Sequence, residues 1–343
     1  MKFVDVSGVG NSGKSALVDL LRELDGFYVP EYWFEFDFIR TPGGLLDLRH
    51  RLLEDWSPVR SDAAYKDFVS LIDVMGPDIP FWDLLGWFKT SGHRYDRRFK
   101  GAFTQLSMEF VESFVIGSYK AYWSFETTRE SNFQRSLKRV ARRCGFGELE
   151  TVYLLSNKDF DEKARVYMAD LYRSFVPPHT DYIIFNNGFE PYNPGPGLTM
   201  LGAKQIVVLR DPRDIYVAGL NSRGLNKEDA QLLATDNYGF SKSFLSTRNL
   251  QFFVKRYKLY REQLCNNSRQ DVLIVNFEEL TGNYNVTLER IMNFLSLETQ
   301  NHTQPQRYFN PAESYKNVGL WRSYSKKDEI RFIESELSQY LSA

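Results

Sequence analysis

A glycine-rich loop near the N-terminus constrains the fold of this chain more than any other feature. Residues 8–15 read GVGNSGKS and fit the pattern G-x-x-x-x-G-K-[ST], in which backbone N–H groups hold phosphate oxygens. The loop follows an apolar run at 3–8, and residues 15–26 carry leucines at helical spacing, with Gly26 as the expected C-cap. Strand, loop and helix in this order predict a phosphate site at the helix N-terminus.

Strands and helices alternate along the C-terminal half of the chain. Apolar runs predict strands within 181–187, 204–214 and 271–280, while amphipathic patterns predict helices over 242–264 and 285–297. This alternation indicates an α/β fold of the P-loop type, with a mostly parallel β-sheet flanked by helices.

A long block between the early and late strands reads mainly as helix. Residues 27–36 predict a second strand that ends in an aromatic, acidic segment. Residues 45–180 then form the block, in which 102–123 is one of the clearer helical segments. We expect one domain over 1–343, in which the block at 45–180 is a large helical insertion that caps the acceptor site.

Composition excludes several classes of protein. The 343 residues carry a net charge of −1, so no global basic field favours nucleic acid as a partner. No apolar run approaches the ~20 residues that a membrane span needs. Cys144 and Cys265 form neither a metal-ligand spacing nor a disulfide framework. We therefore expect a cytoplasmic protein without a membrane span, and its oligomeric state stays open.

Four segments, in the same order along the chain, resemble the motifs of the sulfotransferase superfamily. The glycine loop is similar to the cofactor loop of bacterial members, and LRDPRDIYVAG at 209–219 is similar to their second cofactor motif. VLIVNFEEL at 272–280 and KNVGLWRSYS at 316–325 resemble the two later motifs. The resemblance covers both ends of the fold but leaves out the helical block.

This resemblance implies transfer of a sulfuryl group from 3′-phosphoadenosine 5′-phosphosulfate (PAPS) to an acceptor hydroxyl, without a metal. The loop would hold the 5′-phosphosulfate and Arg210 the 3′-phosphate, with further positive charge from two basic residues of the last motif. The implied cofactor-binding residues are Gly8, Gly10, Asn11, Ser12, Gly13, Lys14, Ser15, Ala16, Arg210, Lys316 and Arg322. Alternatively, the charged residues of 210–214 form a salt-bridge network that caps the next helix.

Three residues are candidates for the chemical step. Lys14 is the cation available to stabilise charge on the leaving oxygen, and an acid must take the proton of the acceptor. Glu31 follows the second predicted strand most closely and is the first choice of base, with Glu35 second. The acceptor is a small molecule or a glycan. The many aromatic residues of the helical block suit a sugar, and include Trp56, Trp82, Trp87 and Trp123.

Other readings follow from departures in these motifs. Asn11 stands where bacterial sulfotransferases usually have a basic residue, and Ala218 replaces a common 3′-phosphate-binding serine, for which Ser222 is a distant substitute. Lys14 and Ser15 match an ATP- or GTP-dependent kinase that uses Mg²⁺, but no acidic residue directly ends a predicted strand to hold the metal. A non-catalytic nucleotide-binding protein is the third alternative.

Overall fold

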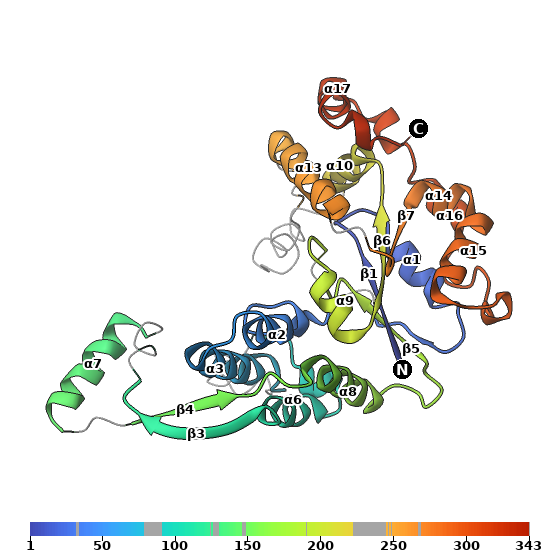
Figure 1. Ribbon diagram of the computed structural model, residues 1–343. Coiled ribbons are helices and arrows are strands. Elements are labelled where there is room, and N and C mark those ends of the chain that lie inside the picture. Colours follow the sequence, from blue (N-terminus) through green and yellow to red (C-terminus); the bar gives the residue numbers. More distant parts are fainter. Residues whose placement is uncertain are drawn as a thin grey trace. The chain divides into compact units, whose positions relative to one another are not determined.

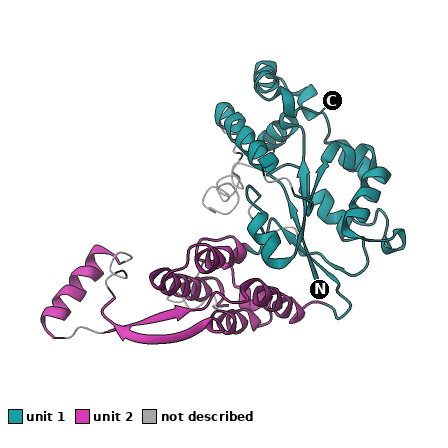
Figure 2. Cartoon of the chain, viewed as in Figure 1, with its two compact units in different colours: residues 1–36, 177–343 teal, residues 37–176 magenta. Residues whose placement is uncertain are grey.

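The chain folds into two compact units in the computed structural model, which describes residues 1–31, 34–78, 91–123, 125, 130–145, 149–189, 191–221, 245, 247, 249–266 and 269–342. Unit 1 combines Met1–Phe36 with Pro177–Ala343, and unit 2 is Asp37–Val176 (Figure 2). Unit 2 lies within a few residues of the block expected at 45–180. Its role as an acceptor cap stays a prediction.

A five-stranded parallel sheet forms the centre of unit 1 (Figure 1), which confirms the predicted α/β class. The spatial order is β2-β5-β1-β6-β7, and every neighbouring pair is parallel. The strands are β1 (Lys2–Ser7), β2 (Phe27–Tyr28), β5 (Tyr182–Asn186), β6 (Lys204–Leu209) and β7 (Val272–Asn276). The chain crosses from one side of β1 to the other between β5 and β6, and such a switch point is where open α/β sheets bind ligands.

Helices cover both faces of this sheet, because its inner strands are apolar on both sides. Along β6, Ile206 and Val208 pack with α1 on one face, while Val207 and Leu209 pack with α10 and α13 on the other. The helices of unit 1 are α1 (Lys14–Leu21), α9 (Gly195–Leu201), α10 (Pro212–Asn221), α13 (Leu250–Asn266), α14 (Phe277–Gly282), α15 (Tyr284–Leu295), α16 (Pro311–Tyr315) and α17 (Lys327–Glu336).

Unit 2 combines helices with a two-stranded antiparallel ribbon. Aromatic side chains fill its interior, and Phe38 contacts Phe68 and Phe103 at ring-centroid distances of 5.0 and 4.9 Å. The ribbon pairs β3 with β4, and Lys120 lies opposite Thr151. Its elements are α2 (Leu45–Leu53), α3 (Pro58–Met75), α5 (Tyr95–Arg98), α6 (Ala102–Glu112), β3 (Val115–Ala121), α7 (Asn132–Arg143), β4 (Glu150–Leu155) and α8 (Phe160–Arg173).

Three local predictions were wrong. The helix expected over 102–123 ends at Glu112, and its C-terminal half is β3, because the segment pairs with β4 and pairing overrides helical periodicity. The second strand shrinks to Phe27–Tyr28, since Pro30 offers no N–H to a ladder. The first helix ends at Leu21, and Gly26, with a φ of 75°, instead forms a later turn.

The later strands match their predicted positions, as does α15. The helix expected from 242 is described from Leu250 onward. Within the described ranges, no helix combines the length and the apolar character needed to cross a bilayer.

Candidate functional site

The glycine loop connects the end of β1 to the start of α1. Two of its glycines are required by close contacts: a Cβ on Gly8 would lie 2.5 Å from Ser12 Oγ, and a Cβ on Gly13 would lie 2.2 Å from the Phe277 ring. Gly13 also has a φ of 86°, a left-handed conformation that favours glycine. The first helical residue is therefore Lys14, at the end of a loop held close to the sheet.

Asn187, in the turn that follows β5, holds the start of the glycine loop. Asn187 Oδ1 accepts a hydrogen bond of 3.1 Å from the Gly8 N–H, and Asn187 itself has a φ of 53°. This role of Asn187 was not predicted, although two asparagines at the end of a buried strand are a visible signal in the sequence. Ser12 is 1% exposed, and its Oγ has no hydrogen-bond partner among the described residues. A buried hydroxyl in this state lacks the partner that such groups normally have.

Lys14 lies beside one of the two candidate bases. Its Nζ is 3.7 Å from Glu35 Oε1, and both side chains are largely buried. Glu31 is exposed, and its carbonyl accepts a hydrogen bond from the Phe34 N–H. The structure therefore pairs Lys14 with Glu35, the second choice from the sequence. Gly10, Asn11 and Ser15 are exposed on the loop, whereas Ala16 is half-buried.

Arg210 brings a buried positive charge to the loop. Only 6% of the residue is exposed, and its guanidinium donates to the Asn11 carbonyl at 2.8 Å and to the Asn317 carbonyl. The guanidinium carbon lies 5.0 Å from the centre of the Phe277 ring, the same ring that packs on Gly13. Phe277 therefore joins the second and third motifs to the loop, a contact that the sequence did not reveal.

The charge of Arg210 is only partly compensated. Burial lowers the pKa of its guanidinium, against the opposing effect of nearby carboxylates. Among the described residues no carboxylate forms an ion pair with it, and its Nε has no hydrogen-bond partner. Because a buried cation is costly without a counter-charge, this position favours an anion beside the loop.

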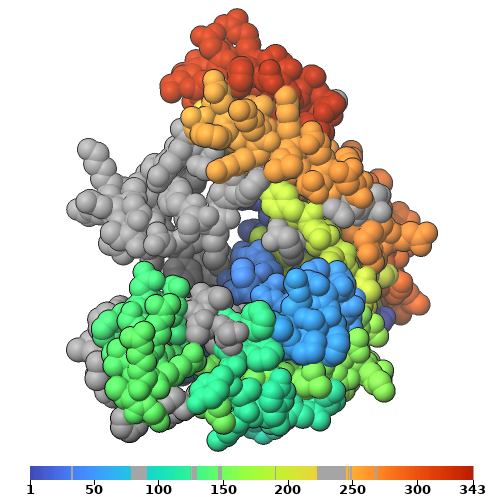
Figure 3. All heavy atoms as spheres, turned by 60° about the vertical axis from the view of Figure 1, so that its left-hand side comes forward, coloured from blue at the N-terminus to red at the C-terminus, as the bar shows by residue number. Residues whose placement is uncertain are grey.

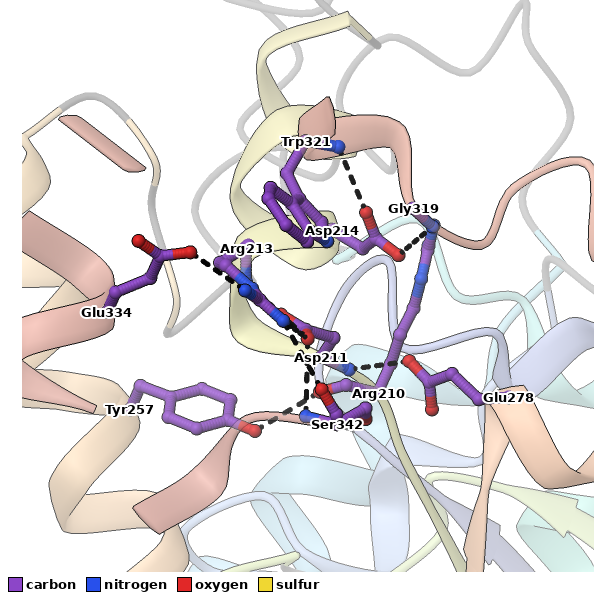
Figure 4. A network of polar contacts seen from close by, with 10 residues as sticks. All are labelled: Arg210, Asp211, Arg213, Asp214, Tyr257, Glu278, Gly319, Trp321, Glu334 and Ser342. Atoms are coloured by element: carbon purple, nitrogen blue, oxygen red, sulfur yellow. Dashed lines mark hydrogen bonds and ion pairs between the residues drawn. The ribbon is translucent and has the colours of Figure 1, made fainter. Parts of the chain in front are cut away.

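Arg213 is a structural residue, as the salt-bridge alternative predicts. It forms an ion pair with Asp211 at 2.6 Å and another with Glu334 at 2.8 Å (Figure 4). Its guanidinium carbon also lies 3.9 Å from the centre of a Trp321 ring. These contacts fix the start of α10 against α17, and Asp211 accepts a further bond from the Ser342 N–H.

Two carboxylates position the segments around Arg210. Asp214 accepts hydrogen bonds from the N–H groups of Gly319 and Trp321, and Glu278 accepts one of 2.8 Å from the Asp211 N–H (Figure 4). Burial raises the pKa of both carboxyls. The second, third and last motifs are thus joined by hydrogen bonds at one end of the sheet.

The two basic residues of the last motif do not join this buried cluster. Lys316 is on the surface, with a side chain 70% exposed and paired with Glu313. Arg322 is exposed, and its guanidinium carbon lies 5.6 Å from the centre of the Trp321 ring. In this conformation the motif contributes the Asn317 carbonyl and not its cations.

Several other predicted positions can be located only in part. Ala218 lies on α10, next to Gly219, where a Cβ would come 3.2 Å from Asn11 Nδ2. Ser222, Trp82 and Trp87 lie outside the described residues. Trp56 donates its Nε1–H to the Leu155 carbonyl, and Trp123 contacts Phe125, so both have contacts within unit 2.

Part of this site lies in a segment that is similar to a known family. The model of the sulfotransferase domain matches residues 192–334, which contain Arg210, Glu278 and the last motif. The matched residues make up less than half of the chain. The comparison with curated proteins found no match.

Solved sulfotransferase structures resemble the chain at low identity. The sulfotransferase domain of the Synechococcus PCC 7002 olefin synthase is 14% identical, covers 98% of this chain and 93% of its own, and has a TM-score of 0.38. The sulfotransferase domain from the curacin biosynthetic pathway is 11% identical, with coverage of 100% and 98% and a TM-score of 0.42. A retinol dehydratase in complex with androsterone and inactive cofactor PAP is 12% identical, with coverage of 99% and 81% and a TM-score of 0.37.

Residues 192–334 are thus similar to a sulfotransferase domain. The described residues contain no group of three or more His, Cys, Asp or Glu side chains arranged to hold a metal ion.

Proposed function

We propose that the chain is a PAPS-dependent sulfotransferase whose cofactor lies between the glycine loop and Arg210. The observation that carries this proposal is the buried, incompletely paired guanidinium of Arg210, whose Nη1 is 2.8 Å from the Asn11 carbonyl of the loop. A site with a loop of backbone donors on one side and this cation on the other suits a nucleotide with two separated anionic groups.

The residues present fit such a cofactor. The unpartnered Ser12 Oγ and Arg210 Nε are donors available to phosphate oxygens, and Gly8 and Gly13 keep side chains out of the loop. When bound, PAPS supplies a sulfuryl group attached to a phosphate leaving group. Lys14 would stabilise the negative charge that develops on the leaving oxygen, an effect of the oxyanion-hole type.

Glu35 is the proposed base. It lies 3.7 Å from Lys14 and is more buried than Glu31, so geometry reverses the order of preference expected from the sequence. Its carboxylate would accept the proton of the acceptor hydroxyl as the new S–O bond forms and the bond to the leaving oxygen breaks. A small-molecule acceptor, with a carbohydrate as first choice, and a cytoplasmic location are further parts of this proposal.

A nucleoside triphosphate is the second candidate ligand, because Lys14 and Ser15 occupy the positions that bind β- and γ-phosphates and Mg²⁺ in P-loop kinases. Thermal unfolding with added nucleotide separates the two. We expect PAPS and its product, adenosine 3′,5′-bisphosphate, to raise the melting temperature in the presence of EDTA. A rise with Mg²⁺-ATP or Mg²⁺-GTP alone would contradict the proposal, and binding of the bisphosphate without turnover of PAPS would favour a non-catalytic protein.

A further inference from the structure

Helix α7 in unit 2 combines a high positive charge with exposure along its whole length. None of its residues is buried, although it is well formed and begins with a capping box between Ser131 and Gln134. It contains no acidic residue but five basic ones: Arg135, Lys138, Arg139, Arg142 and Arg143. In a chain with a net charge of −1, this is a strong local concentration of positive charge.

The apolar residues of α7 lie on one exposed face. Phe133, Leu137 and Val140 are spaced three or four residues apart, so they share one side of the helix. They are 71%, 53% and 59% exposed. Cys144, directly after the helix, extends the same face and is also exposed. At 100° per residue the five basic side chains point to the opposite half of the helix.

Contacts to the β3–β4 ribbon orient the helix. Lys138 forms ion pairs with Glu130 and Glu150, and Arg142 lies 5.7 Å from the centre of the Tyr122 ring. Both contacts involve the basic half, so the apolar face points away from the ribbon. The green spheres of α7 lie on the surface of the molecule in Figure 3.

We propose that α7 binds the surface of an anionic lipid bilayer and lies in its interface. A helix with a narrow apolar face, a polar face whose charges are all positive and low average hydrophobicity is the type that enters the headgroup region. With the apolar face inserted in the bilayer, the long Arg side chains of the opposite half can extend to lipid phosphates.

Charge argues against a second copy of the chain as the occupant. Pairing two α7 helices through their apolar faces would bring two sets of five positive charges together, with no acidic residue in either helix to offset them. An anionic bilayer offers acyl chains to the apolar face of the helix and negatively charged headgroups to its basic side chains. The proposal is independent of which nucleotide the glycine loop holds.

Co-sedimentation of the full chain with vesicles tests the proposal. We expect binding to phosphatidylcholine–phosphatidylserine vesicles but little to pure phosphatidylcholine, and weaker binding at high salt. The double variant Phe133→Ser/Leu137→Ser should lower the partition coefficient about tenfold or more, as should Arg139→Gln/Arg143→Gln. Unchanged melting temperatures would show that the variants fold, as expected for exposed positions.

Matched substitutions elsewhere provide the controls. Phe252→Ser/Val286→Ser removes apolar side chains that are 56% and 71% exposed, and should leave vesicle binding unchanged. Equal binding to neutral and anionic vesicles, or an equal loss in the control variant, would overturn the proposal. So would failure to bind vesicles together with tight binding of α7 to polyglutamate, which would indicate an acidic protein partner instead.

Discussion

At the scale of single residues, Glu35 and Glu31 provide a direct comparison of the two candidate bases. If Glu35 takes the acceptor proton, Glu35→Gln should lower kcat/KM for sulfuryl transfer by about 10²–10⁴-fold. Glu31→Gln is the matched control, because Glu31 is exposed on the same segment, and it should retain nearly full activity. Both rates are measured as release of adenosine 3′,5′-bisphosphate from PAPS, and equal losses would refute the assignment.

Glu278 should make stability depend on pH in a specific direction. Burial raises the pKa of its carboxyl above that of the unfolded chain, about 4.3 for Glu. The folded protein therefore keeps this proton to higher pH, and the stability it contributes is lost as pH rises through the folded pKa. The free energy of unfolding of the wild type, relative to Glu278→Gln, should therefore fall as the pH rises above about 4.3, the pKa of Glu in the unfolded chain. Urea titrations at a series of pH values measure this difference, and a flat or rising difference would be inconsistent with it.

At the scale of elements, one buried carboxylate joins the end of α1 to a distant loop. Glu23 is fully buried and accepts hydrogen bonds from the N–H groups of Gln306, Tyr308 and Phe309, and it contacts His302 Nε2 at 2.8 Å.

Glu23→Ala leaves these buried donors without a partner, and should lower the free energy of unfolding by about 3 kcal/mol or more. Asp328→Ala, at an exposed carboxylate paired with Arg331, is the control and should change it by less than about 0.5 kcal/mol. A similar small effect of both variants in urea denaturation would show that the Glu23 contacts contribute little.

The elements that could be predicted are those whose pattern is local. Composition and order along the chain are enough to recognise the apolar runs of β1, β5 and β6 and the loop before α1. By contrast, β3 looked helical because only its pairing with β4, some 30 residues later, makes it a strand. The roles of Asn187 and Phe277 were hidden for the same reason, since each depends on a partner from a distant segment.

At the scale of the whole molecule, unit 1 assembles one site from segments far apart in the chain. Arg210 contacts Asn11 and Asn317, and it shares Phe277 with Gly13. All four sequence motifs therefore meet at the C-terminal edge of the parallel sheet. We propose that this assembly recognises a 3′-phosphate, which distinguishes a PAPS site from a site for ATP.

Calorimetric titration of adenosine 3′,5′-bisphosphate against adenosine 5′-monophosphate, without metal, tests this claim most directly. The wild type should bind the bisphosphate more than about tenfold more tightly, because a charge-assisted contact to Arg210 is added. Arg210→Gln should abolish this preference and Arg210→Lys should retain part of it, provided that both variants melt cooperatively. Equal affinity of the wild type for the two nucleotides, or binding seen only with Mg²⁺-ATP, would contradict the account.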